Sequence, residues 1–377
     1  MKILTLTALN HFQYGVGCTF AEQLHRGFEK LGHEAMIYDL SPADAVKKLP
    51  AFLNECSPDL VVSMGASGAD FKLGDKFLFA NIPFVGFLID HPAAIHNRLK
   101  ELPNKVALTI VEPLHKNFIE TFCDQKIKTF FLPHAASKLA KSGTTTSVRR
   151  DIVFCGSGAE AQELISWANK SLPPELAKAF FDLSEQVLIS GDFDYSKYFS
   201  IFQGLLQAPF LAMLVNNCDI LVRRTLRYHY LDILDKAGIA VDIFGNNWPQ
   251  QRFKNHRIHA AVTHNEALNI MDNSQLSLCI ADSNPLGSHE RVFDEMLRGN
   301  ICVTTQSKFW QENFVDGEDY FGFDFRNEQQ FIDAIQKALK VDKTPEQRVS
   351  TVTKMNAQHL WFHRAKTIVD EIYPKLK

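Results

Sequence analysis

The sequence predicts an α/β protein with two domains, each built on a parallel sheet covered by helices on both faces. Three observations lead to this fold class. Short apolar runs alternate with amphipathic stretches, which is the pattern of repeated strand–helix–strand units. Several strand segments are apolar throughout, as in parallel sheets that are buried on both faces. The chain has 377 residues, and two domains are the natural expectation at roughly 100–200 residues per domain.

Residues 1–140 are expected to form an N-terminal, Rossmann-like domain. A helix is predicted at 19–31, because Phe20, Leu24 and Phe28 recur at helical spacing and Gly32 can end the helix. A second helix is predicted at 45–56. Residues 137–150 are small and polar, and they are the expected linker. The predicted strands cover 3–9, 35–38, 60–64, 84–89, 107–111 and 129–132.

Residues 151–350 are expected to form a second Rossmann-like domain with a helical insertion at about 160–236. A helix at 352–373, in a closing segment 351–377, is expected to pack back on the first domain. Two such domains in tandem predict a ligand cleft between them, since ligands of open α/β sheets bind at the carboxyl ends of the strands. The predicted strands cover 151–155, 241–244, 276–280 and 301–304, and a further helix covers 331–339.

Composition narrows the function classes. The formal net charge is −3 and the basic clusters are small, so we expect no nucleic-acid partner. The seven cysteines are scattered without a CxxC pair, which predicts free thiols and a cytoplasmic location. No signal peptide or transmembrane segment is expected, because polar residues follow the first strand and no apolar run reaches about 18 residues. Peripheral membrane contact and the oligomeric state stay open.

Two glycine turns follow predicted strands. Gly15 and Gly17 precede a helix that Thr19 or Cys18 is expected to cap, and the backbone N–H groups of such a helix start suit a phosphate or sugar oxygen. Ser157 lies in a Gly-Ser-Gly turn after the strand 151–155, where we expect it beneath a diphosphate. A plain strand–helix turn is the alternative for both.

Asp90 and His91 end another buried strand. Catalytic groups collect at such strand ends, so His91 is a candidate general base or hydrogen-bonding partner of the sugar, oriented by Asp90. A polar loop in which Asp90 caps local backbone is the alternative. His134 also follows a strand, and we interpret it as structural.

The segment 284–300 carries the strongest chemical signal. Ser288 is a good N-cap and Gly299 a good helix stop. Arg291 and Glu295 are four residues apart and are expected together, off the buried face of the helix. Arg291 suits a phosphate and Glu295 a ribose diol, while Gly287 begins a set of free N–H groups for an anion. A surface ion pair worth a few tenths of a kcal/mol is the alternative.

Three segments resemble the carboxyl domain of group 1 glycosyltransferases of the GT-B fold, with the spore-maturation-type branch nearest. They are Ser-His-Glu-Arg-Val-Phe-Asp-Glu-Met-Leu-Arg-Gly-Asn at 288–300, the apolar strand from 301, and Phe-Val-Asp-Gly-Glu at 314–318. Segments 82–92 and 359–365 are similar to the same family. The specific part covers about 80 carboxyl-terminal residues. The resemblance implies metal-independent transfer of a sugar from a nucleotide-sugar to a glycan, protein or small-molecule acceptor, without a cofactor.

The resemblance also implies roles for residues. Arg291 is expected near the diphosphate, Glu295 or Asp294 on the ribose, and Thr263 and His264 in a nucleobase-contacting loop. The family's usual pair of glutamates eight apart is missing, since Gly287 stands eight before Glu295. The predicted catalytic residues are His91, Asp90 and Arg291. The predicted donor-binding residues are Gly15, Gly17, Ser157, Gly245, Thr263, His264, Gly287, Ser288, His289, Arg291 and Glu295.

The stretch 160–236 has no recognised counterpart and is the candidate for acceptor selection. Three other functions stay open at this point. A nucleotide-sugar epimerase would release a modified sugar with no acceptor present. A non-catalytic nucleotide- or sugar-binding protein, or a degenerate glycosyltransferase serving as a scaffold, would share the fold without the chemistry.

Overall fold

The structure is a computed structural model that describes residues 1–7, 15–123, 127–138, 150–158, 161–202, 204, 206–280, 283–341 and 345–377. The chain divides into two compact units. Unit 1 comprises residues 1–138, 202–212 and 357–377, and unit 2 comprises 139–201 and 213–356. Most of the predicted linker, residues 139–149, and residues 10–14 of the first glycine loop lie outside the described residues.

Unit 1 is built on a six-stranded parallel sheet in the order β2-β1-β3-β6-β7-β8. Alternate residues of a strand point to opposite faces, and here both faces are buried. In β3, Leu60 and Val62 join the core on the side of α1, and Val61 joins the core on the side of α2. The strands are β1 (Lys2–Leu6), β2 (Glu34–Tyr38), β3 (Leu60–Met64), β6 (Phe84–Leu88), β7 (Val106–Ile110) and β8 (Lys128–Phe131). The other elements are α1 (Val16–Lys30), α2 (Ala45–Cys56), the hairpin β4 (Lys72–Leu73) and β5 (Lys76–Phe77), a 3-10 turn (Pro92–Ile95), α3 (His96–Leu99) and α4 (His115–Phe122).

The C-terminal helix α14 (Trp361–Thr367) packs on α1 within unit 1. The ring of Trp361 lies 4.8 Å from that of Phe20 and 5.3 Å from that of Phe87. The helices approach closely because α1 carries Gly27, where a Cβ would lie 2.9 Å from the Cβ of Ala365. The chain ends in a π-helical turn (Ile368–Ile372) and a 3-10 turn (Tyr373–Leu376).

The sequence predicts one continuous helix over 352–373, and the structure shows that this prediction is wrong. Two residues, 359 and 360, separate the helix α13 (Pro345–Gln358) from α14. Leu360 between them is extended, with φ −86° and ψ 160°. The interruption has a physical cause, because Leu360 forms a parallel bridge with Ala136, whose N–H donates to the carbonyl of His359 at 2.8 Å.

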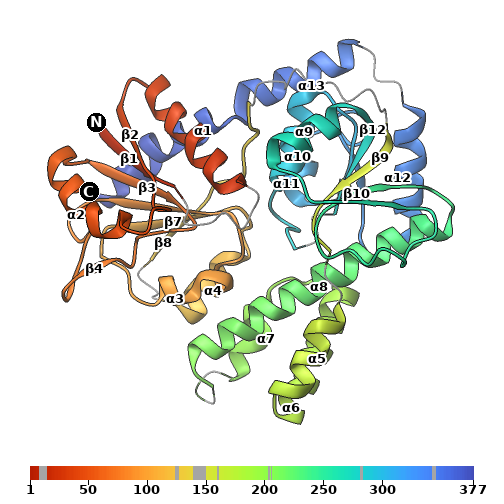
Figure 1. Ribbon diagram of the computed structural model, residues 1–377, viewed down its shortest axis with the longest axis horizontal. Helices are drawn as coiled ribbons and strands as arrows, with labels where there is room; N and C mark the ends of the chain where they lie inside the picture. The colour runs from red at the N-terminus through yellow and green to blue at the C-terminus, as the bar shows by residue number, and fades with distance from the viewer. Residues whose placement is uncertain are drawn as a thin grey trace. The chain divides into compact units, whose positions relative to one another are not determined.

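Unit 2 carries a second six-stranded parallel sheet, in the order β11-β10-β9-β12-β13-β14. Figure 1 shows α9, α10 and α11 on one face of this sheet and α12 on the other. The strands are β9 (Arg150–Cys155), β10 (Asp242–Phe244), β11 (Arg257–His259), β12 (Ser274–Cys279), β13 (Cys302–Thr305) and β14 (Phe321–Phe323). The covering helices are α9 (His264–Asp272), α10 (Glu290–Arg298), α11 (Lys308–Asn313) and α12 (Glu328–Lys340).

The stretch predicted as a helical insertion is helical. The long helix α8 (Ala208–Lys236) leads back to the sheet, and its tyrosine Tyr230 packs on Phe331 of α12 with ring centroids 4.7 Å apart. The α8 helix therefore shares the α12 face of the unit 2 sheet. The other helices of the insertion are α5 (Ala161–Ser171), α6 (Pro174–Ser190), α7 (Tyr195–Phe199) and a 3-10 turn (Ser200–Phe202).

The predicted fold class is confirmed as two Rossmann-like α/β units with a helical insertion in the second. Of the helices in the described parts of the chain, none combines the length and the apolar character that a membrane crossing needs.

Candidate functional site

The candidate site of unit 2 lies where the strand order reverses. Strand β9 is central, with β10 on one side and β12 on the other. After β9 the chain goes on to β10 on one side, and after β12 it goes on to β13 on the other side. The carboxyl ends of β9 and β12 therefore mark the ligand-binding edge of an open α/β sheet. The residues after β9 and those leading into α10 therefore form the expected place for a ligand.

The turn after β9 is held by three side chains from three elements. The guanidinium of Arg291 donates to the carbonyl of Cys155 at 2.6 Å. The indole N–H of Trp248 donates to the carbonyl of Gly156 at 2.8 Å. The guanidinium of Arg227 donates to the carbonyl of Ser157 at 3.0 Å. Three successive carbonyls are thus fixed by side chains, which leaves little freedom for this turn to change its course.

The glycines at this turn are required by close packing. A Cβ on Gly245 would lie 2.2 Å from the carbonyl oxygen of Gly156, and a Cβ on Gly158 would lie 2.4 Å from the indole of Trp248. The backbone N–H of Gly156 donates to the carbonyl of Phe244 at 2.9 Å. The structure therefore brings together the two turns that carry the predicted residues Ser157 and Gly245.

The start of α10 lies beside the same turn. The helix is capped by His289, whose Nδ1 accepts from the N–H of Arg291, and not by Ser288 as predicted. The reason is that Ser288 is completely buried, one residue before the cap. Gly287 is buried as well, and its carbonyl accepts from the hydroxyl of Ser307 at 2.7 Å. The predicted helix stop at Gly299 is confirmed, with φ 70°.

Arg291 points to the end of β9. Its Nη1 would lie 3.3 Å from a Cβ on Gly156, so the guanidinium lies directly against the turn. Its Nε is 3.7 Å from the carboxylate of Glu290. Burial lowers the pKa of Arg291, but the thiol of Cys279 and the carboxylate of Glu290 raise it by more. The guanidinium is therefore a fixed positive charge at the switch point.

Glu295 does not pair with Arg291, and the prediction that both lie off the buried face is wrong for Glu295. Its side chain is completely buried together with Val292, Phe293 and Met296. Its polar neighbours are Ser277 and Asn300, and burial raises the pKa of Glu295 to about 7. The i,i+4 spacing allowed a pair, but the carbonyl of Cys155 takes the arginine and the helix turns Glu295 into the protein.

Asp294, the other carboxylate in this helix turn, is buried too and faces α9. Its Oδ2 lies 3.5 Å from Nε2 of His264, and burial lowers the pKa of that histidine to about 4. At neutral pH His264 is therefore uncharged. Thr263 is the N-cap of α9 and forms a capping box with Glu266. The nucleobase contact of this loop stays a prediction.

The predicted site residues of unit 1 lie at two strand ends. Gly15 is the N-cap of α1, with φ 81°, and Gly17 is buried in the first turn of that helix. The predicted caps Thr19 and Cys18 are wrong, because the helix already begins at Val16 and the hydroxyl of Thr19 donates back to the carbonyl of Gly15 at 3.1 Å.

His91 caps the short 3-10 turn that follows β6. Its Nδ1 accepts from the N–H of Ala93 at 3.1 Å, and its ring meets those of His115 and Phe118 edge-on at 4.6 Å and 5.2 Å. A neutral imidazole that accepts through Nδ1 carries its proton on Nε2. His91 is therefore set to donate a hydrogen bond. Asp90 beside it is exposed.

Sequence reasoning missed Arg227 and Trp248. Each reaches the turn from a position 70 or more residues away in the chain, and no local motif marks either. A weak signal was present, because Arg227 lies one helical turn after the basic pair Arg223 and Arg224.

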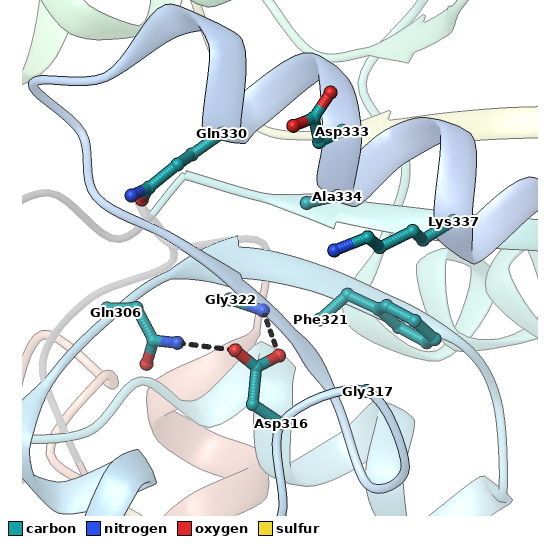
Figure 2. A pocket seen from close by; sticks show the side chains of 9 residues that line it. All are labelled: Gln306, Asp316, Gly317, Phe321, Gly322, Gln330, Asp333, Ala334 and Lys337. Atoms are coloured by element: carbon teal, nitrogen blue, oxygen red, sulfur yellow. Dashed lines mark hydrogen bonds between the residues drawn. The ribbon is translucent and has the colours of Figure 1, made fainter.

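A cavity of about 380 Å³ lies elsewhere in unit 2, at the edge strand β14 (Figure 2). Asp316 accepts there from Gln306 and from the N–H of Gly322, both at 2.9 Å. Two strands, β12 and β13, separate β14 from β9, so this cavity is distinct from the turn that binds Arg291. It is lined by Gln306, Asp316, Gly317, Phe321, Gly322, Gln330, Asp333, Ala334 and Lys337.

Within the described ranges, no three or more His, Cys, Asp or Glu residues come together in a way that could hold a metal ion. The seven cysteines are free thiols. Metal-independent chemistry stays a prediction.

Comparison with known proteins agrees with the fold described above. Residues 224–370 match the model of a family described as glycosyl transferase-like. No curated protein matches the chain. The whole chain shares the GT-B fold, and its segment 224–370 is similar to the glycosyl transferase-like family.

Solved structures share the fold over essentially the whole chain. Sucrose-phosphate synthase from Thermosynechococcus elongatus is similar with a TM-score of 0.55 at 9% identity, covering 100% of this chain and 99% of that one. The T4 phage BGT in complex with its UDP-glucose substrate has a TM-score of 0.54 at 12% identity, with coverage of 100% and 99%. AviGT4, a glycosyltransferase involved in avilamycin A biosynthesis, has a TM-score of 0.53 at 12% identity, with coverage of 100% and 98%.

Replacing Glu295 by glutamine tests its burial. Because its folded pKa of about 7 lies above the ~4.3 of an exposed glutamate, the folded protein binds this proton more tightly than the unfolded chain. The free energy of unfolding should therefore fall as pH rises from about 4 to about 7. We expect Glu295→Gln to be more stable than wild type by about 2–4 kcal/mol at pH 8 and nearly equal to it at pH 4.

Urea denaturation at the two pH values measures this difference. Glu312→Gln, at an exposed position on α11, serves as the control. It should change the free energy of unfolding by the same small amount at both pH values. A stability difference for Glu295→Gln that does not change with pH would contradict the assignment.

Proposed function

We propose that the protein transfers a sugar from a nucleotide-sugar donor whose diphosphate binds unit 2 between the turn after β9 and the start of α10. One observation supports this most strongly. The guanidinium of Arg291 is held 2.6 Å from the carbonyl of Cys155, at the carboxyl end of the central strand. This is the switch point at which open α/β sheets bind their ligands.

The chemistry explains why a fixed arginine belongs there. When the glycosidic bond to the donor breaks, the nucleoside diphosphate departs with added negative charge. Preorganised donors lower the barrier because they are already aimed at that charge and need no reorganisation. The guanidinium fork of Arg291 suits phosphate oxygens, and backbone N–H groups at the start of α10 add the positive end of a helix dipole.

We propose that Asp294, and not Glu295, contacts the donor ribose. Asp294 faces His264 at the start of α9, on the side of the loop expected to contact the base. Glu295 has Ser277, Asn300 and Arg298 among its neighbours, towards the C-terminal end of α10. For the ribose diol to reach Asp294, it must take over the position that His264 now occupies.

In unit 1, we propose that His91 donates a hydrogen bond from Nε2 to an oxygen of the donor sugar or of the acceptor hydroxyl. The Nδ1 contact with Ala93 supports this tautomer. Asp90, exposed beside it, is proposed to orient the same oxygen. The start of α1 at Gly15 and Gly17 is proposed as a further hydrogen-bonding surface for the donor.

We also propose that the chain lies near the spore-maturation-type branch of these enzymes. The support is the sequence of 288–300 and 314–318. A phylogenetic tree of GT-B sequences that groups the chain with another branch would overturn this placement.

A thermal-shift screen of the purified protein against UDP, GDP, dTDP, ADP and CMP, with and without EDTA, tests the donor site. A nucleotide present at about 100 times its Kd should stabilise by about 2.7 kcal/mol, a shift of a few degrees. UDP is tested first, because the similar T4 phage enzyme carries UDP-glucose. We expect one nucleoside diphosphate to stabilise the protein equally with and without EDTA.

Matched variants complete this experiment. Arg291→Ala and Asp294→Asn should lose most of the shift, while Glu295→Gln and the exposed-arginine control Arg326→Ala should keep it. Absence of any shift in the wild-type protein would argue against the proposed function. An unchanged shift in Arg291→Ala would move the donor to another site.

Substitution of His91 tests its part in the chemistry. We expect His91→Phe to lower the rate of donor hydrolysis without acceptor by about 10²-fold or more, because general-acid or hydrogen-bonding groups contribute on this scale. Nucleotide affinity should change little, since the proposed nucleotide contacts are in unit 2. Release of the nucleoside diphosphate measures the rate, with His33→Phe, at a half-buried position of unit 1, as the control. Equal rates in both variants would exclude a contact between His91 and the donor sugar.

A further inference from the structure

We propose that Arg227, on the inserted helix α8, is the second cationic residue of the donor diphosphate site. The inference rests on the proposed function and deepens it, because it assigns a binding role to an element outside the motif-bearing segments. Arg227 and Arg291 donate to the carbonyls of Ser157 and Cys155, two residues apart in one turn. Each guanidinium is therefore anchored to the same short segment.

The two arginines reach this turn from opposite faces of the sheet. Arg291 lies in the first turn of α10, which faces α9 through the pair of His264 and Asp294. Arg227 lies on α8, which packs on α12 through Tyr230 and Phe331. The turn after β9 thus lies between two guanidinium groups, and an anion bound there can receive hydrogen bonds from both sides.

Charge makes the second arginine necessary. A departing nucleoside diphosphate carries two to three negative charges. Arg291 has the carboxylate of Glu290 within 3.7 Å, which offsets part of its field because the interaction of two charges varies inversely with their distance. One partly compensated guanidinium is a weak counterpart for a diphosphate, and Arg227 supplies the added charge.

The surroundings of Arg227 hold it in place for this task. The next residue, Tyr228, packs its ring 4.9 Å from that of Trp248, and the guanidinium of Arg252 lies 4.5 Å above the same tyrosine. Trp248 in turn donates to Gly156 of the turn. Helix α8 is therefore fixed next to the turn, and only the side chain of Arg227 needs to adjust.

The chemistry of the guanidinium permits both roles. It carries five N–H donors in a planar fork, so it can bind a carbonyl and a phosphate oxygen at once. Lysine would keep the charge without this fork. An arginine at position 227 can therefore stabilise the turn in the free protein and the diphosphate in the complex.

Titration calorimetry tests the assignment in the full-length protein. The probes are UDP, UMP and uridine, or the corresponding series for whichever nucleoside diphosphate stabilises the wild type in the screen above. We expect Arg227→Ala to weaken the diphosphate by about 10- to 100-fold, the effect of losing a hydrogen bond to a charged group. Uridine should bind as it does to the wild type, so the preference for diphosphate over nucleoside falls by the same factor. The affinity of Arg227→Lys for the diphosphate should lie between those of the wild type and Arg227→Ala.

The matched control is Arg224→Ala, one helical turn earlier on α8, where the guanidinium lies 3.4 Å from Glu163. It should leave all three affinities unchanged. Wild-type affinity of Arg227→Ala for the diphosphate would overturn the inference and leave the proposed function standing. Equal loss of diphosphate and nucleoside binding, in Arg227→Lys as well as in Arg227→Ala, would reduce Arg227 to a structural residue. If the wild-type protein binds none of the nucleotides, the proposed function and this inference both fail.

Discussion

The hydrogen bond from Arg291 to the carbonyl of Cys155 is the contact on which the candidate donor site depends. It joins the start of α10 to the end of the central strand β9 at 2.6 Å. It fixes the guanidinium relative to the strand, so the positive charge is held at the turn. Gly245 is required at the same turn, because a side chain at this position would overlap the carbonyl of Gly156.

At the site and next to it, the protein buries ionisable groups at a cost. Asp294 and Glu295 are both closed to solvent, and so is most of the side chain of His264. Burying a carboxyl that has only weak partners destabilises a fold. Groups with strongly shifted pKa values gather at functional sites because function can outweigh that cost. The buried contact between Asp294 and His264, next to the start of α9, is the reason to place chemistry here and not at the open, polar cavity beside β14.

The sequence was a good guide where apolar pattern decides the structure. The strand at 60–64 and the helix at 45–56 have the predicted bounds. Buried strands and amphipathic helices can be recognised from the local pattern of apolar residues. Strands β11 and β14 were missed, since three residues at a sheet edge leave almost no pattern. The interruption at Leu360 was missed because its cause is Ala136, more than 200 residues away.

The sequence predicted which residues belong to the candidate site better than it predicted where their side chains point. Helix spacing made Arg291 and Glu295 neighbours, yet a distant carbonyl decided where the arginine points and burial decided where the glutamate points. Arg227 has no motif around it, so only the folded structure brings it to Ser157.

Hydrogen–deuterium exchange of the wild-type protein, with and without saturating UDP, tests the central claim most directly. If the donor binds at the switch point of unit 2, peptides covering 150–158 and 283–298 gain protection, and peptides covering the cavity residues 316–337 do not. Protection of 316–337 with no change at 150–158 would place the nucleotide in the cavity at β14 and contradict the account.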